Sequence, residues 1–283
     1  MQVLVTGSSG FIGKYVRSAL ENQGHDCIGF DVADGNSVED WLHLSTAVSD
    51  GVEAIINLAG VLGTSELFAG GEDTAVKVNI LGALNVYDVA AKAGIPVVQI
   101  GTGHKGQPNP YAITKGCAEE LGLARARWRG EKIVVVRAYH VYGAGQKMCT
   151  PHGTSPVRKI FPSFACRALT GMPIEINGDG DQIIDLVHAR DVAESLVQAI
   201  DGPYGEVVEA GTGVGTTVNW AARTIVAIAN SDSDVKYLPG REGEPEGAVV
   251  VAAKPDCPAH PWPWMVAETV GWYREQLKAK GLL

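Results

Sequence analysis

A glycine-rich stretch near the N-terminus constrains the fold of this chain more than any other feature. Residues 2–5 form a short apolar run, and Gly7, Gly10 and Gly13 follow at three-residue spacing before a helical pattern begins. A strand that turns through glycines into a helix directs free backbone N–H groups, and the positive end of the helix dipole, at one point. A pyrophosphate fits at such a point, so the stretch predicts a dinucleotide-binding loop.

The end of the next apolar run supports this prediction. Residues 27–30 are followed by Asp31, and a carboxylate at the tip of the second strand can accept hydrogen bonds from ribose hydroxyls. A 2′-phosphate at the same place would meet a like charge, and residues 32–35 contain no Arg or Lys. The cofactor predicted is therefore NAD rather than NADP.

The order of the later apolar runs predicts the fold class. Runs at 54–58, 95–100 and 132–141 alternate with helical patterns, among them residues 74–93. This alternation predicts an α/β fold, a Rossmann-type doubly wound parallel sheet with the cofactor across the carboxyl ends of its strands. We expect residues 1–143 to form the NAD-binding domain, with 183–212 returning to it. Residues 144–283 should form mostly a smaller C-terminal α/β substrate lobe.

Charge and cysteine usage narrow the class of protein. The formal net charge is −9 and no basic block is present, which argues against nucleic acid as a partner. No run approaches the ~20 apolar residues of a membrane span, and no signal peptide is evident, so we expect a cytoplasmic protein. The cysteines are scattered without a Cys-x-x-Cys pair, which predicts reduced thiols and no metal site. They are Cys27, Cys117, Cys149, Cys166 and Cys257.

A Tyr-x-x-x-Lys motif follows the predicted strand at 95–100; taken alone, such a motif is common and usually structural. Thr102 follows this predicted strand, and Asn109-Pro110 then supplies an N-cap and a first helical residue. Tyr111 and Lys115 are four residues apart, so they share one face of that helix. A tyrosine hydroxyl has a pKa of ~10, and a nearby ammonium group favours its phenolate form, which is a better base.

Four motifs together resemble a known family. They are Gly-x-x-Gly-x-x-Gly at 7–13, Tyr-x-x-x-Lys at 111–115, Arg-x-x-His-x-Tyr-Gly at 137–143, and G-D-G-x-Q-x-x-D-x-V-H-x-x-D-V-A at 178–193. The chain is similar along nearly its whole length to the extended short-chain dehydrogenases/reductases, in particular to UDP-glucose 4-epimerase-like members of the NAD-dependent epimerase/dehydratase family.

The resemblance implies roles for individual residues. Tyr111 would take a proton from a sugar hydroxyl while hydride leaves the same carbon for NAD⁺, Thr102 would hydrogen-bond that oxygen, and Lys115 would also hold the nicotinamide ribose. The cofactor-binding residues that it implies are Gly7, Gly10, Phe11, Ile12, Gly13, Asp31, Leu58, Ala59, Gly60, Asn79, Tyr111 and Lys115.

The implied substrate is a nucleotide-diphosphate sugar, and two positions depart from the family pattern. His140 stands where the family usually has a substrate-contacting Asn; a hydrogen-bonded strand-end histidine is the alternative reading. Ile184 stands where the family often has an Arg that touches the diphosphate. Arg241 is the preferred replacement, and the other candidates are Arg158, Lys159 and Arg167.

The residues after Thr102 favour one reaction within the family. Gly103 and His104 stand where dehydratases carry Asp-Glu, so we expect a 4-epimerase, with a dehydratase or a 4-keto reductase as the alternative. His104 is a second candidate acid or base. A non-catalytic NAD-binding sensor is the alternative outside enzymes. The resemblance also implies a homodimer formed through the helices at 74–93 and 110–128.

Overall fold

A six-stranded parallel sheet forms the first half of the molecule. The computed structural model describes residues 1–49, 51–256, 260 and 262–283. The strand order β2-β1-β3-β4-β5-β9 reverses direction beside β1, as in a doubly wound sheet, and every neighbouring pair is parallel. The predicted fold class is confirmed. The strands are β1 (Gln2–Thr6), β2 (Asp26–Phe30), β3 (Ala54–Asn57), β4 (Val97–Thr102), β5 (Ile133–Ala138) and β9 (Val207–Ala210).

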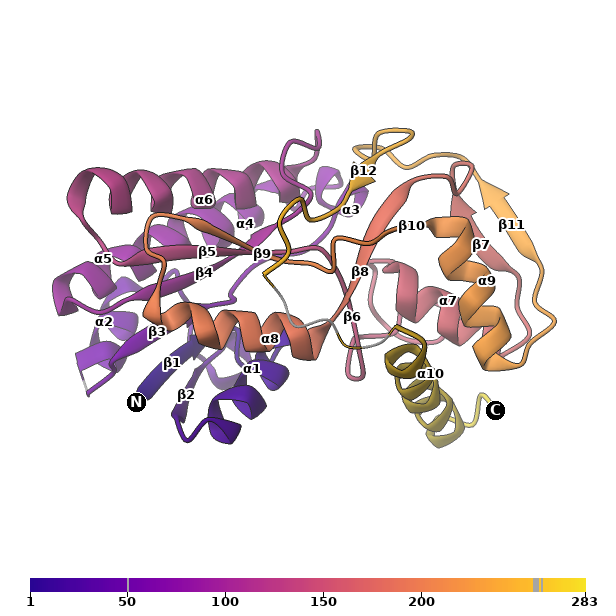
Figure 1. The fold of residues 1–283 in the computed structure, drawn as a ribbon, viewed down its shortest axis with the longest axis horizontal. Coiled ribbons are helices and arrows are strands. Elements are labelled where there is room, and N and C mark those ends of the chain that lie inside the picture. The colour runs from indigo at the N-terminus through magenta and orange to yellow at the C-terminus, as the bar shows by residue number, and fades with distance from the viewer. Residues whose placement is uncertain (50, 257–259, 261) are drawn as a thin grey trace.

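Helices cover both faces of this sheet (Figure 1). One face carries α1 (Phe11–Asn22) and α8 (Ala189–Gln198), which pack against Val3 and Val5 of β1. The other face carries α2 (Trp41–Ser49), α5 (Ala83–Ala93) and α6 (Pro110–Arg129), which pack with Leu4 in a separate cluster. Successive strand residues point to opposite faces, so a continuous apolar strand fills two cores at once.

The helix expected at residues 74–93 begins two residues earlier and changes pitch. It runs through α4 (Glu72–Ala75), the π-helical segment η2 (Val76–Gly82) and α5. Asn79 lies inside the π segment and is 2% exposed. A π turn inside an α-helix redirects side chains and is frequent at functional sites. The short helices η1 (Val32–Asp34) and α3 (Ser65–Phe68) complete the connections of this half.

A smaller unit with its own core adjoins the carboxyl ends of the strands. β8 (Ile183–His188) is its central strand and pairs with β6 (His140–Tyr142), β10 (Gly215–Thr217) and β12 (Val249–Val250). β7 (Ile174–Asn177) and β11 (Val235–Leu238) form a two-stranded sheet. The helices of the unit are α7 (Ile160–Leu169), α9 (Val218–Ala229) and α10 (Trp262–Ala279).

The chain crosses between the two units more than once. Of the stretch 183–212 that was expected to return to the first unit, α8 packs on α1 and β9 completes the parallel sheet, with η3 (Ala199–Asp201) between them. The first part of that stretch, β8, lies in the second unit. Because β5 leads directly into β6, the carboxyl end of the parallel sheet faces the second unit.

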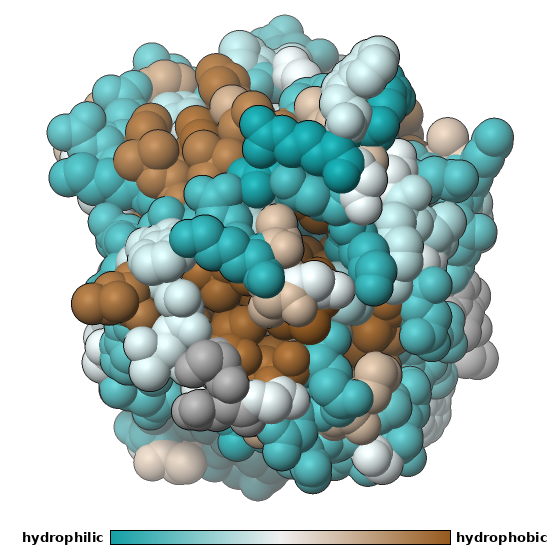
Figure 2. Space-filling model, turned by 90° about the vertical axis from the view of Figure 1, so that its left-hand side faces the viewer, coloured by the Kyte–Doolittle hydropathy of each residue, from teal (hydrophilic) through white to brown (hydrophobic). Residues whose placement is uncertain are grey.

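The surface of the first unit carries several large apolar side chains. Figure 2 shows them gathered in patches among hydrophilic residues on the side of the molecule that it faces. Those exposed on η2 and α6 are Val76, Leu81, Ile113 and Trp128. None of the described helices is both long and apolar enough to cross a membrane. Four cysteines are free thiols, and Cys257 lies outside the described residues.

Candidate active site

The glycine loop is packed too tightly to accept side chains. Gly7 has φ +68°, and a Cβ on it would lie 3.0 Å from the backbone N of Ala59. A Cβ on Gly13 would lie 2.4 Å from the carbonyl oxygen of Gly7. Gly10 is the N-cap of α1, and no side chain caps that helix. The first N–H groups of α1 are therefore left for an anionic ligand, and the cradle fits the pyrophosphate of a dinucleotide.

Asp31 closes the loop from the side of β2. One carboxylate oxygen accepts a hydrogen bond from the backbone N–H of Ser9, and the other accepts one from the N–H of Ala33, each at 2.9 Å. A carboxylate has about four acceptor positions, so two remain for ribose hydroxyls. Asp31 is 9% exposed, which keeps its charge close to any group bound at the loop.

The residues that follow β3 lie next to α6. The side chain of Asn79 accepts a hydrogen bond from the N–H of Val61 at 2.8 Å and donates to the hydroxyl of Thr114 at 2.9 Å. A Cβ on Gly60 would lie 3.2 Å from Asn79 Oδ1 and 3.8 Å from Lys115 Nζ. The small residues at this strand end thus leave the backbone open beside the lysine.

The first turns of α6 hold the predicted catalytic pair. Asn109 caps the helix by accepting from the N–H of Ala112 at 2.9 Å, and Pro110 is its first residue, as the sequence predicts. Burial raises the pKa of Tyr111, and a hydrogen bond from Thr102 lowers it. Burial also lowers the pKa of Lys115 to about 8, although Glu119 opposes the change. Tyr111 and Lys115 thus lie about one turn apart on α6, and the hydroxyl of Thr102, at the end of β4, acts on Tyr111.

A buried carboxylate stands one helical turn beyond the lysine, and sequence reasoning missed it. Glu119 is 1% exposed and accepts hydrogen bonds from Arg137 Nε at 3.0 Å and from Lys105 Nζ at 2.9 Å. Burial alone would raise the pKa of Glu119, but these two cations outweigh it and lower the pKa. The only sequence signal was the four-residue spacing to Lys115, because the partners come from β5 and a loop.

Two histidines continue from Thr102. Nδ1 of His104 lies 3.2 Å from Thr102 Oγ1, and Nε2 of His104 lies 3.1 Å from Nε2 of His140. Burial lowers the pKa of His104 to about 4, with Lys159 adding to the effect. The pKa of His140 is lowered well below its usual value by the same two causes and by His104 itself. Both rings are therefore neutral near pH 7.

The arginines proposed as anion ligands already have carboxylate partners. Arg241 contacts Glu66 at 2.7 Å and Glu244 at 3.1 Å. Arg158 and Arg167 both contact Glu175, at 2.6 and 2.7 Å. Ile184 is buried in the core of the second unit. The charge of Lys159 lowers the pKa of both histidines. Burial lowers the pKa of Lys159 itself.

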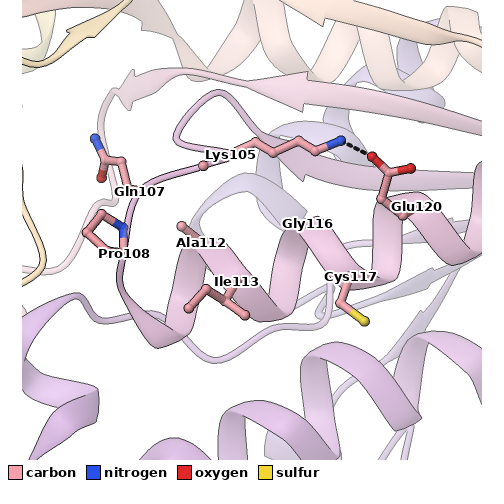
Figure 3. A pocket seen from close by; sticks show the side chains of 9 residues that line it. Lys105, Gln107, Pro108, Ala112, Ile113, Gly116, Cys117 and Glu120 are labelled. Carbon is pink, nitrogen blue, oxygen red and sulfur yellow. Dashed lines mark hydrogen bonds and ion pairs between the residues drawn. The ribbon is translucent and has the colours of Figure 1, made fainter.

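A separate pocket lies away from these groups. It has a volume of about 540 Å³ and lies between the loop at 105–108 and α6, where Lys105 and Glu120 form an ion pair (Figure 3). Ala112, Ile113 and Cys117 line it, whereas Tyr111 and Lys115 do not. The pocket therefore belongs to the outer face of α6 and not to the predicted catalytic face.

Comparison with known proteins identifies the family of this chain. The family model described as the NAD dependent epimerase/dehydratase family matches residues 3–211, and the chain belongs to this family. The resemblance found in the motifs is thereby confirmed. The chain is 24% identical to UDP-N-acetyl-alpha-D-glucosaminuronate decarboxylase of Bacillus cytotoxicus, over 96% of this chain and 97% of that protein.

Epimerases are among the similar proteins as well. The chain is 26% identical to a putative UDP-glucose 4-epimerase of Methanocaldococcus jannaschii, over 86% of this chain and 87% of that protein. It superposes on the structure of UDP-glucose 4-epimerase from Thermotoga maritima with UDP-glucose, with a TM-score of 0.84 and 25% identity, covering 98% of this chain and 100% of that one.

Proposed function

We propose that this protein is an NAD-dependent nucleotide-sugar 4-epimerase. The observation that carries the proposal is the placement of Tyr111 beside Thr102 and one helical turn before Lys115, on the same parallel sheet as the glycine loop that leaves a dinucleotide cradle after β1. Similarity to proteins named for UDP-sugar chemistry along most of their length supports a nucleotide-diphosphate sugar as the substrate. His140 and Arg241, and Arg158 as a weaker candidate, remain the proposed substrate contacts.

The chemistry divides between the cofactor and the protein. Bound NAD⁺ would accept a hydride from the sugar carbon and return it to the opposite face of the ketone. Tyr111 takes the proton of the hydroxyl on that carbon and gives it back in the second half of the reaction. Thr102 donates a hydrogen bond that favours the phenolate. We expect the ammonium of Lys115, which shares the helix face of Tyr111, to favour it by charge as well. The full reaction cycle therefore releases and takes up no net proton.

The residues after Thr102 support epimerisation over elimination. A Cβ on Gly103 would lie 2.5 Å from the ring of Tyr139, so no carboxylate side chain fits there. Glu119, the buried carboxylate of α6, is occupied by Arg137 and Lys105. Elimination of water needs an additional acid and base, whereas epimerisation needs only hydride transfer out and back. His104 keeps a dehydratase as the second candidate, since a neutral imidazole can serve as a base.

The cofactor preference proposed is for NAD. Asp31 is held against the glycine loop by the N–H of Ser9, so its charge cannot swing away from a bound ribose. A 2′-phosphate on that ribose would be repelled by the negative charge of Asp31. Asp31→Ser is expected to bring the affinity for NADP within about tenfold of that for NAD. Titration of both cofactors by fluorescence tests this.

Incubation with UDP- and dTDP-hexoses tests the proposed reaction. Conversion between 4-epimers with no net NADH supports it, whereas a 4-keto-6-deoxy product indicates a dehydratase and consumption of added NADH indicates a reductase. Tyr111→Phe should reduce turnover by more than about 10³-fold while NAD binding is kept. Tyr204→Phe, at an exposed tyrosine, is the matched control. If Tyr111→Phe turns over normally, the assignment of the base fails.

The exposed apolar residues of the first unit support a homodimer. Val76, Leu81, Ile113 and Trp128 are exposed on the two helices proposed for the contact, and exposed apolar residues favour contact with a second apolar surface. Ile113→Glu is expected to give a monomer by light scattering. Val214→Glu, at an equally exposed position in the second unit, should leave the mass unchanged.

A further inference from the structure

The loop between β4 and α6 is fastened to α6 by one long side chain. Lys105 follows Thr102 by three residues, and its Nζ lies 2.9 Å from Oε1 of Glu119. It also forms an ion pair with Glu120, and Figure 3 shows the side chain stretched along the helix to reach it. On the way it passes Gly116, where a Cβ would lie 3.6 Å from Lys105 Cγ. The loop is therefore attached to the helix that carries the predicted catalytic pair.

Glu119 is a buried anchor for this lysine. Its side chain is 1% exposed and also accepts a hydrogen bond from Arg137 Nε of β5 at 3.0 Å. A Cβ on Gly101 of β4 would lie 3.1 Å from Glu119 Oε2, so the carboxylate lies against the strand one residue before Thr102. Burial by itself would raise the pKa of Glu119, but its bonds with the two cations lower it, so the anchor stays charged. One carboxylate of α6 thus lies against β4 and bonds to both β5 and the loop.

The residue before Lys105 holds the hydroxyl of Thr102. The backbone N–H of His104 donates to Thr102 Oγ1 at 3.2 Å, and the ring nitrogen Nδ1 of His104 lies 3.2 Å from the same oxygen. The backbone N–H of Lys105 donates to the carbonyl oxygen of Thr102 at 3.3 Å. A threonine side chain has three staggered rotamers about χ1, and these contacts fix which of them the hydroxyl occupies. The position of the loop therefore sets the direction of the Thr102 hydroxyl.

The rest of the loop has few attachments to α6. A Cβ on Gly106 would meet no atom within 4 Å, and the pocket of about 540 Å³ lies between this part of the loop and the helix (Figure 3). The N–H of Gln107 donates to the carbonyl oxygen of His104 at 3.0 Å, which shapes the loop without attaching it to the helix. Of residues 103–108 in the described chain, Lys105 is the one whose side chain hydrogen-bonds to α6. Removal of this side chain should therefore free the loop to move.

We propose that Lys105 and Glu119 are positioning residues that hold the loop against α6, so that His104 keeps the Thr102 hydroxyl directed at the oxygen of the reacting sugar carbon. This role rests on the proposed function, because the proposed function assigns that oxygen to Thr102. Lys105 and Glu119 contact no reacting atom and act through His104 and Thr102. Misplacement of an aligned group by about 1 Å is enough to slow a reaction about 100-fold, so a loop that moves lowers the rate of the chemical step.

Hydrogen exchange of the nucleotide-free protein tests the attachment without any sugar. Lys105→Met removes the ammonium and leaves Glu119 paired with Arg137, so no buried charge loses all its partners. We expect the amides of His104 and Gln107 to exchange at least about tenfold faster in this variant, while amides in the second half of α6 exchange at unchanged rates. Unchanged exchange of the two loop amides would overturn the proposal.

Glu120→Gln is the matched control, because it removes the exposed partner of Lys105 and keeps the buried one. The side chain of Glu120 is 66% exposed, whereas that of Glu119 is 1% exposed. The loop amides of Glu120→Gln should exchange as they do in the unaltered protein. Exchange as fast as in Lys105→Met would mean that Glu120 is the anchor, and the role of Glu119 would fail.

The anchor itself is tested with a double variant. Glu119→Gln alone would leave the guanidinium of Arg137 without its buried partner, which is strongly destabilising. Glu119→Gln/Arg137→Met removes both charges and leaves Lys105 a neutral acceptor, with which a hydrogen bond is roughly half as strong. We expect the loop amides of this variant to exchange faster than those of the unaltered protein. Unchanged exchange, with folded protein by circular dichroism, would contradict the anchoring role of Glu119.

The split between kcat and KM separates positioning from a purely structural role. In Lys105→Met we expect kcat to fall about 10- to 100-fold while KM and NAD affinity stay within about twofold, because Lys105 contacts neither ligand in the proposed arrangement. Lys105→Arg can still reach Glu119 and should recover most of the lost rate. Full activity in Lys105→Met, or no recovery in Lys105→Arg, would count against the positioning role.

Failure of this role and failure of the proposed function are distinguishable. If Lys105→Met converts hexoses as fast as the unaltered protein does, the positioning role fails and the proposed function stands. If the unaltered protein converts no hexose, the proposed function fails and the catalytic part of the role fails with it. Hydrogen exchange then still decides whether Lys105 and Glu119 hold the loop.

Discussion

The part of the site proposed for the cofactor and the part proposed for the substrate, called here the cofactor half and the substrate half, are built on different principles. Around the glycine loop the contacts are made by backbone groups whose positions are set by Gly7 and Gly13, where no side chain fits. In the second unit the candidate contacts are long charged side chains, and Arg241 and Arg158 are each neutralised by carboxylates. The backbone groups of the first half need no rearrangement of side chains, whereas under the proposed function the arginines of the second half exchange ion-pair partners when a phosphate enters.

This difference predicts that the two ligands bind with different strengths. A rigid backbone cradle costs little conformational entropy when a ligand binds, because few side chains are immobilised. Exchange of Glu66 for a phosphate on Arg241 gains only the difference between two charge-assisted contacts. We therefore expect tight binding of the dinucleotide and weaker, salt-sensitive binding of the nucleotide sugar.

The largest effect is expected from breaking the cofactor half. In Gly13→Ala the new Cβ meets the carbonyl oxygens of Gly7 and Ser8 at 2.4 and 2.6 Å, so the loop must open. We expect NAD affinity to fall by more than about 10³-fold and unfolding free energy by about 2–3 kcal/mol. Calorimetric titration and urea unfolding measure the two. Gly271→Ala is the control, since a Cβ there meets nothing within 4 Å; retained NAD binding in Gly13→Ala would contradict the cradle.

The next effect concerns the buried ammonium group of Lys115. Because the pKa of Lys115 is lowered from 10.5 to about 8 by burial, the unfolded chain binds more protons than the folded chain between these pH values. Burial of the Lys115 ammonium therefore lowers the free energy of unfolding by on the order of 3 kcal/mol at pH 7, and this loss becomes smaller as the pH rises towards 10.5. Lys115→Met should be more stable at pH 7 and inactive.

Urea unfolding of the nucleotide-free protein at pH 7 and pH 10 checks this sign. The stability difference between Lys115→Met and the unaltered protein should shrink at the higher pH. Lys280→Met, at an exposed lysine, should show no such trend. A variant that is destabilised equally at both pH values would mean that the buried ammonium has compensating partners.

A smaller effect distinguishes the two arginines of the substrate half. Arg241→Met is expected to weaken UDP binding about tenfold in the NAD-saturated protein, with the salt dependence reduced, because one phosphate contact is lost. Arg158→Met should change UDP affinity less than twofold, since Arg241, and not Arg158, is among the charges that act on Lys159 beside the two histidines. Calorimetric titration at two salt concentrations measures both. The reverse ranking would assign the phosphate contact to Arg158.

The smallest effect tests whether the substrate half must exchange ion-pair partners. Glu66→Gln removes one carboxylate that competes with phosphate for Arg241, so UDP affinity should rise about threefold while NAD affinity stays the same. Glu175→Gln is the matched control and should leave UDP affinity unchanged. Weaker UDP binding in Glu66→Gln would mean that Glu66 positions Arg241 for the ligand instead of competing with it.

The parts of the site that could be predicted are those encoded over short distances. The glycine spacing, the N-cap Asn109 and the four-residue step from Tyr111 to Lys115 each depend on neighbours within one strand, turn or helix. The parallel sheet followed from the alternation of apolar runs. The helix at 74–93 was predicted without its π turn, because the turn reflects how Asn79 contacts both Val61 and Thr114 and not the local propensity.

The sequence by itself determined that a strand, a glycine turn and a helix would form a dinucleotide cradle, and that a tyrosine and a lysine would share a helix face. Only the tertiary structure decided that His104 meets His140 across 36 residues, that Glu119 is held by Arg137, and that Arg241 is paired with Glu66. The physical reason is range. Backbone geometry follows from neighbouring residues, whereas side-chain pairs depend on which strand ends and loops the folded chain places together.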